Sequence, residues 1–166
     1  MEVRFESAEG KSARLELPPR WPGESVYIVA GHKTGSVLLS NIVTDLARET
    51  GLPAVPVESA VWSQGFSIGD WPDELYDLLK EPGYVFHSFR WLQKLPNVPE
   101  FETGKKIFLV RDPRDVAVSY YYSMRKSHGL PKTGKSRDMI ANARKEAQGM
   151  DIDEFVQAGK ADVVLR

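Results

Sequence analysis

Residues 33–36 follow the apolar run 26–30 after two intervening residues. They combine a cation, Lys33, with two hydroxyls, Thr34 and Ser36, and a glycine, Gly35. Gly35 permits a tight backbone turn, the hydroxyl side chains donate hydrogen bonds, and Lys33 adds a compact positive charge. Residues of these types between a strand and a helix suit the binding of phosphate or sulfate. An ordinary connecting loop with a surface lysine is the alternative interpretation.

The order of residues in this segment distinguishes two kinds of phosphate-binding loop. In the loop of ATPases and GTPases a lysine directly follows a glycine, whereas here Lys33 precedes Gly35. This order disfavours a nucleoside triphosphatase or a kinase-like phosphotransferase, and no carboxylate is evident for binding magnesium. The sequence also lacks a group of residues with the spacing of metal ligands, so we expect no metal site.

A second segment, "RDPRDVAVS", runs from Arg111 to Ser119 and follows another apolar run. Arg111 offers the paired N–H donors that bind a phosphate, and the Ser119 hydroxyl can help to bind the same anion. Asp112 and Pro113 are typical of the start of a helix. A helix start with solvated charges is therefore the alternative interpretation.

Both segments need a strand before them and a helix after them. The run Val26–Ala30 is apolar and continuous, as in a strand buried on both faces of a parallel sheet. Apolar residues recur at helical spacing from Val37, and Gly51 with Pro53 ends that helix. The run 105–110 and the residues after it predict a second unit of strand, loop and helix.

The remaining elements complete an alternation of strands and helices. Alternating apolar and polar residues at 2–6 and 13–17 predict an N-terminal hairpin. Further strands are expected at 53–58 and 83–89, loops at 60–71 and 127–136, and helices at 72–80 (with Pro72 at its first position), 113–126, 137–148 and 150–159. The predicted fold class is α/β, a three-layer sandwich with a central parallel sheet, P-loop-like, plus an N-terminal β-hairpin.

Composition excludes several classes of protein. The 166 residues fit one domain, with a hairpin and linker at 1–24 and an α/β core at 25–166. The 22 Lys and Arg nearly balance the 23 Asp and Glu, so no global field favours nucleic acid or an anionic membrane. The absence of cysteine excludes disulfides and thiolate nucleophiles and favours a cytoplasmic location. A charged N-terminus and the lack of about 18 consecutive apolar residues predict neither a secretion signal nor a membrane span.

Together the two segments resemble the motifs of sulfotransferases that use 3′-phosphoadenosine 5′-phosphosulfate (PAPS). The first loop of that family has the form P-K-[ST]-G-[ST]-[ST], which "HKTGSV" matches from Lys33 to Ser36. The second family motif, R-[ND]-P-[RK]-D-x-x-x-S, matches "RDPRDVAVS" at every position. The resemblance covers about residues 25–158. It implies in-line transfer of a sulfuryl group from PAPS to a hydroxyl or amine of a small-molecule or carbohydrate acceptor, without a metal.

The resemblance also implies roles for individual residues. Lys33 would stabilise charge on the leaving phosphate. Arg111 and Ser119 would recognise the 3′-phosphate of the donor. The residues that would hold its 5′-phosphosulfate are Lys33, Thr34, Gly35, Ser36 and Val37.

A catalytic histidine is implied by "YVFHSF", which resembles the family strand that ends in the general base. His87 would remove the proton of the acceptor hydroxyl, a role that suits an imidazole near neutral pH. An unremarkable histidine at the end of a strand is the alternative. His32, in the first loop, and His128, in a basic loop, are weaker candidates.

This sequence departs from the family pattern in three ways. Val37 stands where the family usually has a second hydroxyl residue, and Leu38 where many members have an aromatic near the nucleotide. The family domain normally continues to a glycine- and lysine-rich loop over the 3′-phosphate and adenine, so we expect a truncated chain or a minimal member. Lys132, Lys135 and Arg137 can replace part of that charge, with a solvated loop as the alternative.

Aromatic residues are candidates for the wall of an acceptor pocket, with burial in the core as the alternative. They are Trp62, Phe66, Trp71, Phe89 and Trp91. A second hypothesis for the whole chain is a non-catalytic protein that binds PAPS or the desulfated nucleotide. Association into a homo-oligomer stays open.

Overall fold

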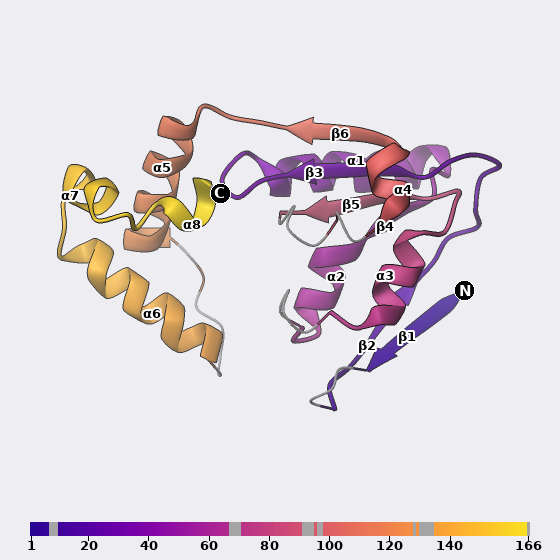
Figure 1. The fold of residues 1–166 in the computed structure, drawn as a ribbon, viewed down its shortest axis with the longest axis horizontal. Helices are drawn as coiled ribbons and strands as arrows, with labels where there is room; N and C mark the ends of the chain where they lie inside the picture. Colours follow the sequence, from indigo (N-terminus) through magenta and orange to yellow (C-terminus); the bar gives the residue numbers. More distant parts are fainter. Residues whose placement is uncertain are drawn as a thin grey trace. The chain divides into compact units, whose positions relative to one another are not determined.

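Four parallel strands form the sheet that carries the first predicted loop. The sheet lies in the first of two units, Met1–Val110 and Arg111–Arg166, which are described separately. In the computed structural model shown in Figure 1, the described residues are 1–6, 10–66, 71–90, 95, 98–127, 129 and 135–165.

The order of the strands in the sheet is β4-β5-β3-β6. The strands are β3 (Val26–Ala30), β4 (Ala54–Pro56), β5 (Val85–Phe89) and β6 (Lys105–Leu109). Every neighbouring pair is parallel, so the carboxyl ends of all four strands lie at one edge of the sheet. Because β3 and β5 are the two central strands, the segments that follow them are neighbours at this edge.

Helices cover both faces of the sheet. Helix α1 (Ser36–Thr50) packs on one face, where Ile28, Val43 and Val85 form a small core. The opposite face carries α2 (Val57–Ser63), α3 (Asp73–Leu79) and α4 (Pro99–Thr103) (Figure 1). The predicted α/β sandwich with a central parallel sheet is confirmed.

The N-terminal hairpin consists of β1 (Glu2–Glu6) and β2 (Ser12–Glu16), which pair antiparallel. Alternation along β2 directs Ala13 and Leu15 into the large core, together with Phe5 of β1, while the residues between them are exposed. The predicted hairpin is therefore confirmed, and its inner face extends the layer formed by α2 and α3.

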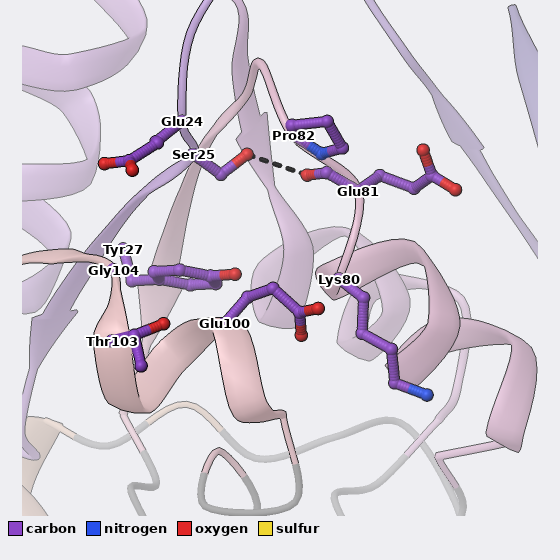
Figure 2. Close-up of a pocket in the computed structure, with 9 residues that line it drawn as sticks. All are labelled: Glu24, Ser25, Tyr27, Lys80, Glu81, Pro82, Glu100, Thr103 and Gly104. Carbon is purple, nitrogen blue, oxygen red and sulfur yellow. Dashed lines mark hydrogen bonds between the residues drawn. The ribbon is translucent and has the colours of Figure 1, made fainter.

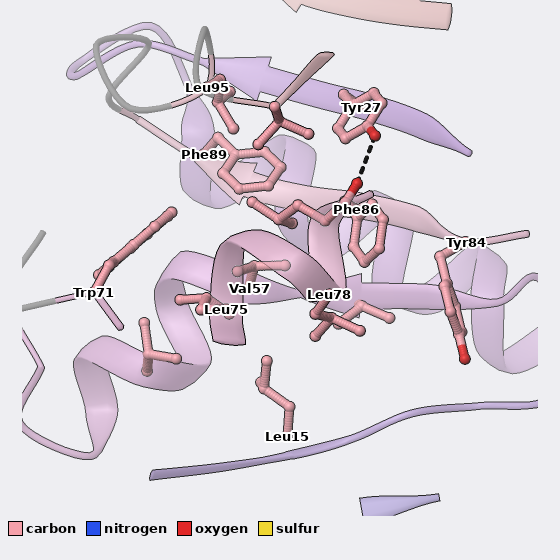
Figure 3. Packing of buried hydrophobic residues seen from close by; sticks show 14 of the residues in the cluster. Leu15, Tyr27, Val57, Trp71, Leu75, Leu78, Tyr84, Phe86, Phe89 and Leu95 are labelled. Carbon is pink, nitrogen blue, oxygen red and sulfur yellow. Dashed lines mark hydrogen bonds between the residues drawn. The ribbon is translucent and has the colours of Figure 1, made fainter. Parts of the chain in front are cut away.

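Aromatic rings fill much of the large core (Figure 3). Tyr27 packs between Phe86 and Phe101, and its hydroxyl donates a 2.6 Å hydrogen bond to the carbonyl oxygen of Leu79. Burial raises the pKa of the Tyr27 phenol to about 12. This contact ties the central strand β3 to the end of α3.

The second unit contains only helices among its described residues. They are α5 (Pro113–Tyr122), a π-helical turn (Ser123–Ser127), α6 (Lys135–Gln148), α7 (Ile152–Gln157) and α8 (Asp162–Leu165). Tyr121, Met124, Ile140 and Phe155 contribute to a separate core. No helix in the described part of the chain is both long and apolar enough to cross a membrane.

Several predicted boundaries differ from the structure. The loop expected at 60–71 begins inside α2, because Val57 and Val61 bury one face of a helix too short for a clear periodic pattern. Pro72 is the N-cap of α3 and not its first helical residue. The helix expected at 113–126 continues beyond Tyr122 as the π-helical turn, and α4 was not predicted.

Candidate functional site

The loop between β3 and α1 is a tight turn closed by its own residues. Thr34 donates twice to the carbonyl oxygen of Gly31, from its hydroxyl at 2.7 Å and from its backbone N–H at 3.3 Å. Lys33 and Gly35 both have a positive φ, 62° and 106°. No described side chain caps α1, so its first amides face the loop without a side-chain acceptor. Such amides favour a bound anion.

An irregularity in β5 shapes the neighbouring strand end. The register between β3 and β5 shifts after Tyr27, which pairs with Phe86, so that Val29 pairs with Phe89. Within the shifted segment Ser88 has a φ of 73°. Lys33 and Ser88 are the two non-glycine residues with a positive φ in the described part of the chain, and both lie at this edge of the sheet. Strain of this kind tends to gather at functional sites.

The shift in β5 places His87 and Ser88 beside hydroxyl groups from two helices. The Ser40 oxygen on α1 lies 2.8 Å from the Ser88 oxygen and 3.3 Å from Nδ1 of His87. The Ser88 oxygen lies 3.4 Å from the same nitrogen, and Ser59 on α2 donates to Ser88 at 3.2 Å. We call Ser40, Ser59, Ser88 and His87 the serine–histidine cluster.

His87 is buried, with 1% of its surface exposed. The resemblance implied a strand that ends in a histidine, but β5 continues to Phe89. Burial lowers the pKa of the His87 imidazole to about 4, because the charged form loses its hydration. The ring is therefore neutral at physiological pH. Its Nε2 atom is buried and has no hydrogen-bond partner among the described residues.

Arg90 follows β5 directly and reaches the first loop. Its Nε donates a 3.2 Å hydrogen bond to the Ser36 oxygen at the start of α1. Its backbone N–H donates a 2.8 Å hydrogen bond to the carboxylate of Glu58 on α2, and its Nη1 lies 3.9 Å from the other carboxylate oxygen. A buried carboxylate on α2 thus orients a guanidinium toward the loop.

The second predicted segment lies in the other unit and opens α5. Asp112 is the N-cap: its carboxylate accepts a 2.9 Å hydrogen bond from the backbone N–H of Arg114, and Pro113 is the first helical residue. Arg114 lowers the pKa of the Asp112 carboxyl through this contact and a side-chain hydrogen bond, the latter being the larger cause. Arg111 is exposed, with its Nε 3.5 Å from Asp115, and Ser119 is half-buried in the helix.

A comparison with protein-family models matches residues 24–158 to the sulfotransferase domain. The chain belongs to the sulfotransferase domain family. No curated protein and no solved structure matches the chain significantly. The match includes both segments that carry the resemblance.

Two departures of this sulfotransferase-domain protein from the family pattern lie at the start of α1. Val37 and Leu38 are 62% and 67% exposed. Neither side chain supplies a hydroxyl or an aromatic ring at that position. The assignment of Val37 to the donor site stays a prediction.

The aromatic residues expected around an acceptor are divided by the structure. Phe66, Trp71 and Phe89 belong to the large core, whereas Trp62 is 48% exposed on α2. For these three rings the alternative interpretation, burial in the core, therefore applies. The rest of the set, Trp91, lies outside the described residues, as do His128, Lys132 and the side chain of Lys135.

A pocket of about 190 Å³ lies away from the candidate site of this sulfotransferase-domain protein (Figure 2). It is lined by Ser25 and Gly104, which precede β3 and β6, so it lies at the amino ends of the strands. Its lining includes three glutamates, Glu24, Glu81 and Glu100, and one lysine, Lys80, so its net negative charge opposes the binding of an anion. Across the described residues, no group of three or more potential ligands could hold a metal ion.

Residues that the sequence reasoning missed include Arg90, Glu58 and Ser40. A signal for Arg90 was present, because it follows an apolar strand directly, as Arg111 follows the run 105–110. Glu58 and Ser40 had no such signal, because their relevance depends on contacts with distant residues.

Proposed function

We propose that this protein transfers a sulfuryl group from PAPS to a hydroxyl or amine acceptor. The observation that carries the proposal is the loop after β3, where Lys33 and Gly35 take positive φ values ahead of uncapped helix amides. The sulfotransferase domain match at 24–158 supports the reaction class. The residue types fit a phosphosulfate, since they supply a cation, hydroxyl donors and backbone N–H groups without a metal.

In this proposal the 5′-phosphosulfate is held by the first loop. The Ser36 hydroxyl and the first amides of α1, including that of Val37, donate to phosphate oxygens, and Thr34 holds the turn through Gly31. Arg111 and Ser119 are assigned to the 3′-phosphate, on the match of "RDPRDVAVS" to the family motif. A guanidinium suits this role because it donates two parallel hydrogen bonds to one phosphate.

The proposed chemistry is an in-line displacement at sulfur. The acceptor oxygen or nitrogen forms a bond to sulfur while the bond from sulfur to the bridging phosphate oxygen breaks, and the electron pair leaves with that oxygen. Lys33 stabilises the charge that develops there. His87 accepts the proton of the acceptor at Nε2.

A hydrogen-bond partner for Nδ1 of His87 supports this proton transfer. For Nε2 to accept a proton, Nδ1 must carry the other one and donate it. The Ser40 oxygen, 3.3 Å from Nδ1, can accept that hydrogen bond and donate its own proton to Ser88. Because Nε2 is buried, an acceptor can contact it only after neighbouring side chains move.

The burial of His87 favours a second candidate, a non-catalytic protein that binds PAPS or the desulfated nucleotide. Burial of the proposed base is compatible with nucleotide binding, which does not require His87. The two candidates therefore differ in turnover and not in ligand preference.

Calorimetry with adenosine 3′,5′-bisphosphate, ADP and ATP, each with and without magnesium, tests the proposal. We expect a preference for the 3′-phosphorylated nucleotide that does not depend on magnesium. Transfer of labelled sulfate from PAPS to a mixed panel of hydroxyl and amine acceptors then separates the two candidates. Magnesium-dependent preference for ATP would contradict both.

His87→Ala tests the assignment of the base. We expect unchanged affinity for adenosine 3′,5′-bisphosphate and loss of sulfate transfer, because the histidine does not contact the nucleotide in the proposal. Normal transfer by the variant would refute the assignment.

A further inference from the structure

The contact between Arg90 and Ser36 joins the end of β5 to the proposed donor loop. The two residues are 54 positions apart, and a 3.2 Å hydrogen bond from the guanidinium Nε to the serine oxygen connects them. Neither the sequence motifs nor the family match assigns a role to Arg90.

Glu58 on α2 holds Arg90 in place through two contacts. Its side chain is 9% exposed, against 28% for Arg90, so the carboxylate depends on the partners that it finds in the protein. It accepts the backbone N–H of Arg90 at 2.8 Å and lies 3.9 Å from the guanidinium. Removing only one charge of such a partly buried pair leaves the other poorly compensated. Arg90 is thus anchored both by its backbone and by its side chain.

The direction of the hydrogen bond determines what Ser36 can do. A guanidinium nitrogen can only donate, so the Ser36 oxygen accepts from Arg90 and its own proton must point to another acceptor. Ser36 is also the first residue of α1, next to the uncapped amides. Arg90 cannot accept the Ser36 hydroxyl proton, so this proton can be donated to an anion bound at the start of α1.

We propose that Arg90, held by Glu58, is a positioning residue that presets the Ser36 hydroxyl as a donor to the 5′-phosphate of the nucleotide. This inference rests on the proposed function. Because the charges of Arg90 and Glu58 offset each other, the contribution of the pair is orientation and not added positive charge. The effect of Arg90 should therefore depend on the 5′-phosphate and on Ser36.

Two nucleotides distinguish this role from a structural one. Adenosine 3′,5′-bisphosphate carries the 5′-phosphate, and adenosine 3′-monophosphate lacks it. For Arg90→Met we expect the Kd of the bisphosphate to rise roughly tenfold, because such a change corresponds to the loss of one hydrogen bond to a charged group. The Kd of the monophosphate should stay unchanged. Arg48→Met is the control, since Arg48 is an exposed arginine of α1 paired with Asp45.

A double-mutant cycle tests the dependence on Ser36. In a Ser36→Ala background, Arg90→Met should weaken bisphosphate binding little further, because the hydroxyl that it orients is gone. Arg90→Lys keeps the ion pair with Glu58 and should restore part of the affinity. This variant also serves as the test if Arg90→Met does not fold, as judged by circular dichroism and thermal unfolding.

The outcomes separate the two proposals. If the unmodified protein binds no adenosine 3′,5′-bisphosphate, the proposed function fails. If it binds the bisphosphate and the Arg90 variants bind equally well, the role of Arg90 is overturned while the proposed function stands. Equal losses for both nucleotides, or full additivity with Ser36→Ala, would also overturn it.

Discussion

The hydroxyl oxygen of Ser40 lies 3.3 Å from Nδ1 of His87, across 47 residues of sequence. The Ser88 oxygen is 2.8 Å from the same hydroxyl, so Ser40 can accept from the imidazole and donate to Ser88. This arrangement accommodates the tautomer with a proton on Nδ1 and a lone pair on Nε2, the form that a general base needs.

Replacing Ser40 should therefore impair the proposed base without affecting nucleotide binding. For Ser40→Ala we expect a kcat roughly tenfold lower and an unchanged Kd for adenosine 3′,5′-bisphosphate. Nitrogen NMR of the imidazole should show a smaller fraction with the proton on Nδ1, a readout that does not require turnover. Ser63→Ala, at an exposed serine bonded within α2, is the control. A weaker nucleotide affinity with an unchanged tautomer would argue against this role of Ser40.

The burial of His87 should make stability depend on pH in a defined window. The pKa of its imidazole is about 4 in the folded protein and near its ordinary value of 6.5 in the unfolded chain. Between these values the unfolded chain binds more protons, so the free energy of unfolding falls as the pH drops from 6.5 toward 4. The full loss is on the order of 3 kcal/mol.

Urea unfolding at several pH values measures this contribution. In His87→Gln the slope of stability against pH between 6.5 and 4 should be shallower than in the unmodified protein, because one titrating group is lost. Between pH 7 and 8 the two slopes should agree, since the imidazole is neutral in both states there. Identical slopes below pH 6.5 would show that His87 is not buried in its neutral form.

Gly35 should be needed for the conformation of the proposed donor loop. Its φ of 106° is strained for any residue with a Cβ, and a Cβ there would lie 3.4 Å from the Leu109 side chain. Gly35→Ala should cost roughly 1–3 kcal/mol of stability and also weaken the binding of adenosine 3′,5′-bisphosphate.

The control for Gly35 is Gly10→Ala in the hairpin. Gly10 has a φ of 75°, and a Cβ added to it would meet no described atom within 4 Å, so the substitution imposes backbone strain without touching the loop. We expect a loss of stability with unchanged nucleotide affinity, measured by urea unfolding and calorimetry. If both alanine variants bind the nucleotide normally, the loop does not contact it.

Arg111 should provide discrimination for the 3′-phosphate. In Arg111→Ala we expect the preference for adenosine 3′,5′-bisphosphate over AMP to fall roughly 10- to 100-fold, as for a hydrogen-bonded charged pair. Stability should change little, because the ion pair with Asp115 is exposed. Lys160→Ala, which removes another surface ion pair of the same unit, should keep the preference. A preserved preference in Arg111→Ala would place the 3′-phosphate elsewhere.

Several elements follow from local sequence patterns. The continuous apolar run Val26–Ala30 and the glycine after it predicted β3 and its turn, because these signals act over a few residues. Asp112 and Pro113 predicted the start of α5, since a side-chain acceptor and a residue without an N–H suit the first turn of a helix. The short helix α2 escaped prediction because seven residues hold too few periods to stand out.

The serine–histidine cluster and the Arg90–Glu58 pair could not be predicted in the same way. Arg90 and Glu58 are 32 residues apart, and their contact depends on α2 packing beside the end of β5. Likewise, the positive φ of Ser88 accompanies a register shift between β3 and β5, and no local sequence pattern predicts that shift.

The sequence by itself determined most of the strands and helices, the lysine and glycine of the proposed donor loop, and membership of a sulfotransferase-like class, because each depends on residues close together in the chain. Only the tertiary structure decided that His87 is buried against Ser40 and that Arg90 reaches Ser36. Burial and hydrogen bonding between distant segments arise from how the sheet and helices pack, and that packing sets the charge state of His87 and the direction of the Ser36 hydroxyl.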